Sequence, residues 1–168
     1  MNLFYLHQDP KVAARLHCDK HVVKMVLETA QMLSCAHHVN GTSVSSDKLY
    51  GKTHVHHPST IWVRSAPLHY KWAYELFIAL CDEYTLRYNK THLSDTKLRS
   101  VLSTYPEFTN DDQTFTPPPL AMPEKYWVSG QKVNTKSSTV VKSYQQYYYY
   151  EKRYMAKYTN RTVPSFML

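Results

Sequence analysis

The stretch from Asp9 to His38, DPKVAARLHCDKHVVKMVLETAQMLSCAHH, predicts a long helix around which the rest of the chain is organised. Asp9 can cap the helix with its carboxylate, and Pro10 suits the first helical position, where the missing N–H costs nothing. No Gly or Pro follows until Gly41. The sequence therefore predicts one continuous helix over residues 10–37, of about eight turns.

Polar residues of this helix fall on one narrow stripe when the residues are spaced by about 100°. The stripe consists of His17, His21, Lys24, Glu28 and Gln31. The wide remaining arc is largely apolar, with Leu16, Val22, Val23, Met25, Val26, Leu27, Ala30, Met32 and Leu33. An ordinary surface helix shows the opposite proportions. We therefore expect a helix buried on three sides whose stripe faces a functional cleft; the alternative is a solvated strip on a central helix.

Length and composition indicate one soluble domain spanning residues 1–168. The chain is 43% apolar, and it contains neither an apolar run long enough for a membrane span nor a secretory signal pattern. Its three cysteines, Cys18, Cys35 and Cys81, match no CxxC pattern. A reduced intracellular compartment is expected, the cytoplasm of a host cell if the protein is phage-encoded.

The formal net charge of +7 suits a polyanionic partner, either DNA or a nucleotide. Only three glycines are present, which argues against a many-turned β fold and against glycine-rich phosphate loops. Together with the helical periodicity, this scarcity predicts an all-α fold. The oligomeric state stays open.

Three further helices are expected near residues 59–89, 94–104 and 138–158. The first is interrupted at Pro67, with Ser65 as the cap of its second part, and Ser94 caps the next helix. The apolar residues 1–7 are expected as a buried, extended lead-in. The proline-rich connector 105–130 must be irregular, and it carries apolar residues that would pack it down.

Glu28 is the leading candidate for chemistry, because a carboxylate beside a cation in a cleft can act as a general base or stabilise a developing positive charge. His21 and Lys24 would position Glu28 or a phosphate. The predicted substrate-binding residues on the helix are His17 and Gln31. Those expected to line the cleft from elsewhere are His56, His57 and Arg64.

The C-terminal segment interleaves tyrosines with basic residues, among them Lys152 and Arg153. Such a segment can stack on bases and pair with phosphates, so both basic residues are predicted to bind nucleic acid. The alternative is that its tyrosines form a core-facing stripe at helical spacing. That stripe would contain Tyr147, Tyr150, Tyr154 and Tyr158.

Histidines could instead ligate a metal. His17 and His21 are four residues apart, and a second group lies at His54, His56 and His57. Zinc accepts such ligands, but no second spaced Cys/His pair completes a known pattern and the HExxH order is absent. We therefore expect no metal and no other cofactor.

The chain resembles the pyrimidine dimer DNA glycosylase family of the phage endonuclease V type, and it is similar in pattern to small phage proteins. A short apolar segment leads into a long helix that carries His-x6-Glu, here His21 and Glu28. A loop ending in His57-Pro58 precedes a second helix. Further matching positions are Trp62, Tyr70, Glu75, Arg161, Pro164 and Phe166.

This resemblance implies a compact all-α domain in which the N-terminal α-amine attacks the C1′ carbon of a sugar and expels a base. It also implies that Glu28 is essential and that His21 contacts the site. Two positions depart from the family pattern. Residue 2 is Asn, which generally keeps the preceding Met, whereas the family exposes a small residue. Leu27 stands where the family has a basic residue, a role that Lys24 could take.

Residues and resemblance together favour an N-glycosidase acting on DNA or on nucleotides. A non-catalytic phage factor that binds nucleic acid or a host protein is the second hypothesis. A metal-dependent enzyme that uses the histidines is the third.

Overall fold

A computed structural model of the protein describes residues 1–109, 113–128, 130 and 136–168. Six α-helices pack together, and the described residues contain no β-strand, which confirms the all-α prediction. The helices are α1 (Pro10–Leu16), α2 (Asp19–Asn40), α3 (Pro58–Val63), α4 (Pro67–Tyr88), α5 (Leu93–Leu98) and α6 (Ser137–Lys152). Short 3-10 turns lie at Ser46–Lys48, Val101–Ser103, Glu124–Tyr126, Arg153–Met155 and Ser165–Met167. None of the helices in the described ranges is both long enough and apolar enough to span a membrane.

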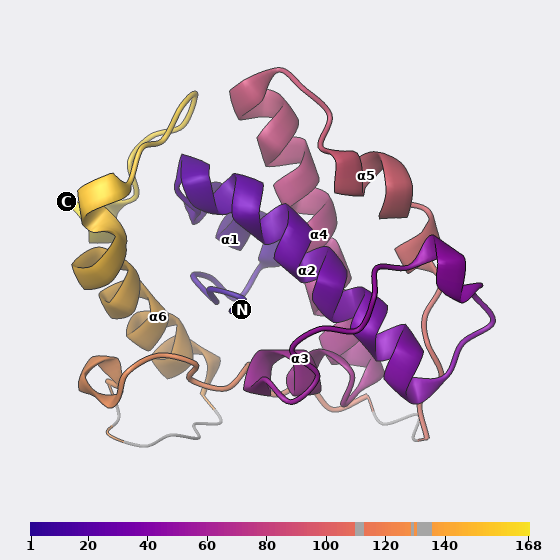
Figure 1. The fold of residues 1–168 in the computed structure, drawn as a ribbon. Coiled ribbons are helices and arrows are strands. Elements are labelled where there is room, and N and C mark those ends of the chain that lie inside the picture. Colours follow the sequence, from indigo (N-terminus) through magenta and orange to yellow (C-terminus); the bar gives the residue numbers. More distant parts are fainter. Residues whose placement is uncertain (110–112, 129, 131–135) are drawn as a thin grey trace.

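The long helices α2 and α4 lie along each other at the centre of the fold, and α1 also packs on α4 (Figure 1). α6 stands to one side, and the N-terminal segment runs between it and α2 (Figure 1). The core is continuous across these elements. Its largest wholly buried side chains include Tyr5, Met25, Leu33, Tyr70, Phe77, Tyr144 and Tyr148.

The prediction of one helix over residues 10–37 is wrong in one respect, because the helix is broken at His17 and Cys18. Asp9 does cap α1, where its carboxylate accepts a hydrogen bond from Lys11 N at 2.8 Å, and Pro10 begins the helix. His17 then adopts an extended conformation with ψ of 138°, and α2 begins at Asp19.

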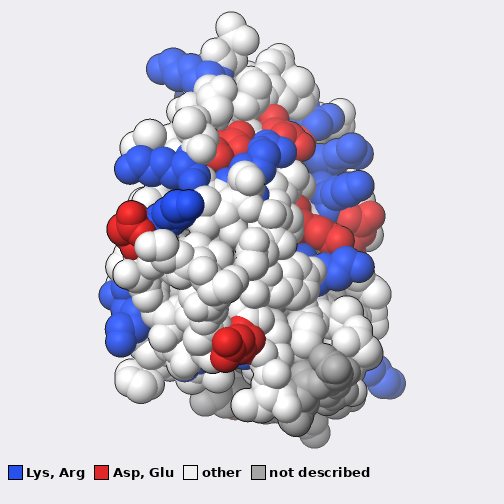
Figure 2. Space-filling view, turned by 90° about the vertical axis from the view of Figure 1, so that its right-hand side faces the viewer, with Lys and Arg blue, Asp and Glu red and all other residues white. Residues whose placement is uncertain are grey.

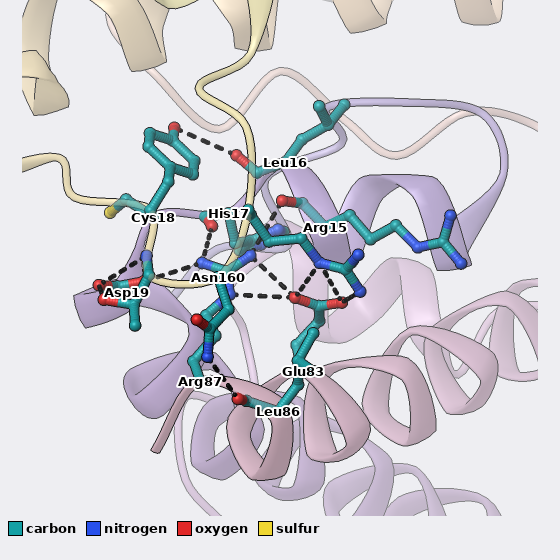
Figure 3. A network of polar contacts seen from close by, with 12 residues as sticks. Arg15, Leu16, His17, Cys18, Asp19, Glu83, Leu86, Arg87 and Asn160 are labelled. Carbon is teal, nitrogen blue, oxygen red and sulfur yellow. Dashed lines mark hydrogen bonds and ion pairs between the residues drawn. The ribbon is translucent and has the colours of Figure 1, made fainter. Parts of the chain in front are cut away.

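Tertiary hydrogen bonds take the place of the helical ones at this break (Figure 3). The Arg87 guanidinium donates to the carbonyl oxygens of Arg15 at 2.9 Å and His17 at 2.6 Å. Cys18 N donates to the Tyr148 hydroxyl at 2.8 Å, and Asp19 N donates to Lys157 O at 2.8 Å. Backbone groups that would otherwise continue the helix are thus satisfied by α4, α6 and the C-terminal tail.

Within α2, the predicted burial on three sides holds, with two exceptions. The residues that are wholly buried include Val22, Met25, Val26, Ala30, Met32 and Leu33. Val23 and Leu27, which belong to the predicted apolar arc, are instead exposed. They border the edge of α2 that carries Lys24 and Glu28, so the open face is wider than the polar stripe alone predicts.

Two predicted helix caps are wrong. Ala66, not Ser65, occupies the N-cap of α4, and the Ser65 hydroxyl donates instead to Trp62 O at 2.7 Å. His92 caps α5, because its Nδ1 accepts the hydrogen bond from Ser94 N at 3.0 Å. The interruption before Pro67 and the start of the last helix at Ser137 agree with the sequence.

The alternative reading of the C-terminal tyrosines places the core-facing stripe in the wrong register. Val140, Tyr144 and Tyr148 are buried, whereas Tyr150 and Tyr154 are exposed, the latter at 85%. The connector is packed down as expected by Leu120, Met122 and Tyr126, although its residues 110–112 and 129 lie outside the described part. Residues 2–6 are buried as predicted, with Leu3 to Leu6 in the core, but His7 is exposed. The predicted extended conformation is wrong at Phe4, where a φ of 48° turns the chain.

Candidate active site around Glu28

Glu28 lies midway along α2 and interacts with two cations. Lys24 Nζ, one turn earlier on the same helix, lies 3.5 Å from Glu28 Oε1. The α-amine of Met1 lies 3.9 Å from Glu28 Oε2. The Met1 side chain is 1% exposed, the Glu28 side chain is 16% exposed, and the Lys24 side chain is 55% exposed. The carboxylate therefore stands at the boundary between the protein interior and solvent.

A tight turn of residues 1–4, the hook, brings the amine to this place. Phe4 has a φ of 48°, a left-handed conformation that is unusual for a bulky residue. The Asn2 side chain accepts a hydrogen bond from Phe4 N at 3.0 Å and donates one to Ala121 O at 2.9 Å. Backbone strain of this kind persists only where the surrounding packing enforces it, and it is concentrated at functional sites.

Glu28 Oε2 is a buried polar atom without a hydrogen-bond partner. The 3.9 Å that separates it from the amine nitrogen exceeds the usual hydrogen-bond range of about 2.7–3.2 Å. Buried carboxylate oxygens are nearly always hydrogen-bonded, so an unpartnered one calls for an explanation. A substrate group or a proton moving between amine and carboxylate would provide it.

His21 lies two turns before Glu28 on α2 and packs in an aromatic cluster. Its ring is 4.5 Å from the ring of Phe4 and 5.2 Å from that of Tyr148, centroid to centroid. Burial lowers the pKa of His21 to about 3, with further lowering by His17, Lys152 and Lys24. His21 is therefore a neutral side chain at physiological pH, and its buried Nδ1 has no hydrogen-bond partner.

His57 reaches the site from the start of α3. Its Nδ1 accepts a hydrogen bond from Ser59 N at 3.1 Å and so caps this helix. Burial lowers the pKa of His57, and the Met1 amine and His54 lower it further, while Glu28 acts in the opposite direction. Neutral His57 carries its proton on Nε2, because Nδ1 is the acceptor of the capping bond.

α6 closes the other side with Tyr147 and Lys152. The Tyr147 ring stacks on Phe4 at 6.2 Å, and Lys152 Nζ lies over the Tyr147 ring at 5.2 Å. Lys152 is also close enough to His21 to lower the pKa of that ring. Two lysines, Lys24 and Lys152, thus flank the hook from opposite helices.

The other predicted site residues lie outside this arrangement or at its edge. His17 is not on α2 at all: it is wholly buried at the α1–α2 break, with Nδ1 2.7 Å from Ala13 O and a pKa lowered to about 4 by burial. Gln31 is half-buried one turn after Glu28. His56 is exposed, and Arg64 donates to Val55 O at 2.7 Å and so braces the loop before α3. Arg153 is exposed and bonds to the Tyr149 hydroxyl.

A metal centre finds no support in the described ranges, where no group of three or more His, Cys, Asp or Glu residues could hold an ion. The histidines His17 and His21 are engaged in aromatic packing instead of converging with the loop that contains His56 and His57.

The net positive charge is not gathered into one patch on the face shown in Figure 2, where blue and red groups lie side by side along the edges and the centre is largely uncharged.

A comparison with known protein families matches residues 1–96 to the family described as pyrimidine dimer DNA glycosylase. The chain belongs to this family. The glycosylase match contains the hook, α2 with Glu28 and the His57 cap, and it ends within α5, so α6 with Lys152 lies beyond it. Comparisons with curated proteins and with solved structures gave no match.

Two residues of the site were not singled out from the sequence. In the sequence, Asn2 stands out only as a departure from the glycosylase pattern, and its bond to Ala121 depends on a contact across the fold. Nothing in the sequence predicts the left-handed conformation of Phe4, because Gly or Asn usually occupies such a position. The one available hint was the unbroken apolar run of residues 3–6 directly before a helix cap.

Proposed function

We propose that this protein is a DNA N-glycosidase that releases a base by attack of the Met1 α-amine on the sugar, with Glu28 as its proton acceptor. The observation that carries the proposal is the position of the Met1 α-amine, 3.9 Å from a buried carboxylate oxygen that has no hydrogen-bond partner. Membership of the pyrimidine dimer DNA glycosylase family supports the substrate class.

The reaction follows from these groups. The ammonium first loses a proton to solvent. The lone pair of the neutral amine then forms a bond to C1′ while the bond between C1′ and the base nitrogen breaks, and the electron pair of that bond leaves with the base, which takes up a proton. The nitrogen, now positively charged, passes a proton to Glu28. The carboxylate also stabilises the positive charge that develops on the sugar in the transition state. The sugar ring then opens, O4′ gains a proton, and C1′ is held as an imine to the amine.

The residues around the pair suit a DNA strand. Lys24 is exposed next to Glu28 and can contact a phosphate, and Lys152 offers a second contact from α6. His57, neutral with its proton on Nε2, is a candidate donor to the leaving base or to the sugar oxygen. Such phosphate contacts predict binding that weakens as the salt concentration rises.

The test measures base release from oligonucleotides with and without ultraviolet-induced pyrimidine dimers. The wild type should release base from the damaged strand, and Glu28→Gln should lower turnover by about 100-fold or more while leaving DNA binding intact. Glu75→Gln is the matched control, because Glu75 also pairs with a lysine one turn earlier, Lys71, but lies on α4. Its activity should equal that of the wild type.

The outcome that would overturn the proposal is equally specific. If the wild type binds DNA but releases no base from either oligonucleotide, the protein is a non-catalytic DNA-binding member of its family. Equal losses of activity for Glu28→Gln and Glu75→Gln would mean that Glu28 has no special role.

The phosphate contacts are tested separately. Reversing the charge of Lys152 with Glu should weaken DNA binding more than the same change at Arg153, which bonds to Tyr149 away from the hook.

A further inference from the structure

We propose that Asn2 is a positioning residue that aims the α-amine at Glu28, and that the reacting amine belongs to a retained Met1. This inference rests on the proposed function for its catalytic part. It departs from the family pattern stated above, in which the first Met is removed and a small residue carries the amine.

Both polar atoms of the Asn2 side-chain amide form hydrogen bonds. Its Oδ1 accepts from Phe4 N at 3.0 Å, and its Nδ2 donates to Ala121 O at 2.9 Å. The first bond is the local turn that asparagine side chains form with the backbone two residues further on. The second ties the hook to the connector before α6. Asn2 itself is nine-tenths buried, so these bonds are shielded from water.

The hook needs such support because of Phe4. A left-handed conformation is unfavourable for a residue with a bulky side chain. The Phe4 ring offsets this cost by packing on His21, Tyr147 and Tyr148. Packing holds the Phe4 ring and the buried Met1 side chain, and the two Asn2 bonds set the path of the backbone between them. Without them the amine would lose its fixed position relative to Glu28.

The position of Asn2 also identifies the residue that carries the reactive amine. Removal of Met1 would transfer the free amine to Asn2, displacing it by about one residue, or roughly 3.8 Å. The separation from Glu28 Oε2 is 3.9 Å with Met1 in place. The side chain of residue 2 is committed to the turn, so the chain cannot slide forward to restore that separation without breaking both bonds.

The first experiment identifies the amine. The intact mass of the purified protein should correspond to a chain that retains Met1. Borohydride added during base release should reduce the imine by delivering a hydride to C1′, leaving a stable C–N bond to the protein. Peptide mapping should place this sugar adduct on the Met1 nitrogen. An adduct on Asn2 in a shortened chain, or on Lys24, would overturn the inference while leaving glycosidase activity in place.

The second experiment tests positioning with two variants that both keep a large residue after Met1. Asn2→Leu removes both side-chain bonds, and Asn2→Asp keeps the acceptor for Phe4 N. Misplacement of a reacting group by about 1 Å can cost on the order of 100-fold. We expect kcat to fall about 10- to 100-fold in Asn2→Leu and less in Asn2→Asp, with KM within about threefold of the wild type in both.

Asn40→Leu is the matched control, because Asn40 also donates to a tertiary carbonyl, Arg64 O at 3.0 Å, at the far end of α2. It loses a comparable bond and should keep the wild-type kcat. A kcat of wild-type size in Asn2→Leu, or equal losses in Asn2→Leu and Asn40→Leu, would refute the positioning role.

A third measurement does not depend on activity. The Met1 side chain is 1% exposed, and the Asn2 bonds hold the chain that leads to it, so an amine-acylating reagent should modify the Met1 amine more slowly than an unrestrained N-terminus. Asn2→Leu should raise that rate about tenfold, Asn2→Asp should raise it less, and Asn40→Leu should leave it unchanged. An unchanged rate in Asn2→Leu would show that Asn2 does not hold the amine. If base release is absent in the wild type while the rates follow this order, the proposed function fails but the role of Asn2 in placing the amine stands.

Discussion

Two buried groups of charges in this protein differ in how completely they are satisfied. At the α1–α2 break, Arg87 bonds to Glu83, Asp19 and two backbone carbonyls, and Arg161 and Thr159 bond to the same carboxylates (Figure 3). At the candidate active site, Glu28 Oε2 and His21 Nδ1 are buried without a hydrogen-bond partner, and the Met1 amine lies 3.9 Å from that oxygen.

The difference indicates different roles. The Arg87 network holds three distant parts of the chain together, although one buried nitrogen at the break, His17 Nε2, has no hydrogen-bond partner. Unsatisfied buried groups lower stability, and a fold can keep them where a ligand or a proton completes them. The comparison therefore predicts a structural role for the Arg87 network and a chemical role for the carboxylate beside the Met1 amine, and each prediction can be tested by its effect on stability.

The largest effect is expected from Arg87→Met. The Arg87 side chain is fully buried. Its loss removes the cation paired with Asp19 and leaves the carbonyls of Arg15 and His17 without their hydrogen bonds from Arg87. Breaking a buried ion pair in this way costs about 3–5 kcal/mol, measured as the free energy of unfolding in urea. Arg153→Met, at an exposed arginine, is the control and should change stability little. A loss below about 1 kcal/mol for Arg87→Met would contradict a structural role.

The next effect concerns pH. Burial lowers the folded-state pKa of His21 to about 3 and the pKa values of His17 and His37 to about 4, from 6.5 in the unfolded chain. The unfolded state then binds more protons between these values, so stability falls as pH decreases through this window. Each histidine should contribute about 1.4 kcal/mol per pH unit between roughly pH 6 and 4.5.

Urea unfolding at several pH values measures this slope. His21→Phe keeps an aromatic ring against Phe4 and Tyr148 but cannot titrate, so about a third of the slope should disappear. His56→Gln, at an exposed histidine, should leave the slope as it is. A wild-type stability that stays constant from pH 6 to 4.5 would contradict the lowered pKa values of all three buried histidines.

A smaller loss of stability is expected from Tyr148→Phe. Tyr148 contacts both regions, and this substitution removes only its hydrogen bond at the break. Its hydroxyl accepts the hydrogen bond from Cys18 N at the break, and its ring packs on His21 and Phe4 at the site. Removing only the hydroxyl should cost about 1–2 kcal/mol, because a buried N–H loses its partner. Base release should be unaffected; a fall in kcat together with unchanged stability would reverse the assignment.

The smallest stability effect is expected from Glu28→Gln. Glutamine keeps the shape of the side chain, Glu28 Oε2 has no hydrogen bond to lose, and Lys24 is solvated. The free energy of unfolding should change by about 1 kcal/mol or less, within the range of ordinary substitutions. Glu83→Gln is the comparison, since Glu83 bonds to both Arg87 and Arg161 and should lose several-fold more. Equal losses in the two variants would remove the distinction between the regions.

The sequence by itself determined the helical class, the central helix and the edge on which Lys24 and Glu28 lie. These features are local: apolar periodicity, a cap at Asp9 and a proline at the first position act within a few residues. For the same reason the sequence identified His57-Pro58 as the start of a helix, and the resemblance carried by His21 and Glu28 led to the family.

Only the tertiary structure decided the break at His17, the burial of that residue and the register of the C-terminal tyrosines. The break exists because Arg87, Tyr148 and Lys157, distant in sequence, satisfy backbone groups that a continuous helix would pair within itself. The hook at Phe4 has the same origin, since Asn2 reaches Ala121 across the fold. Local propensity sets which helix can form, whereas long-range hydrogen bonds set where it stops and where the amine lies.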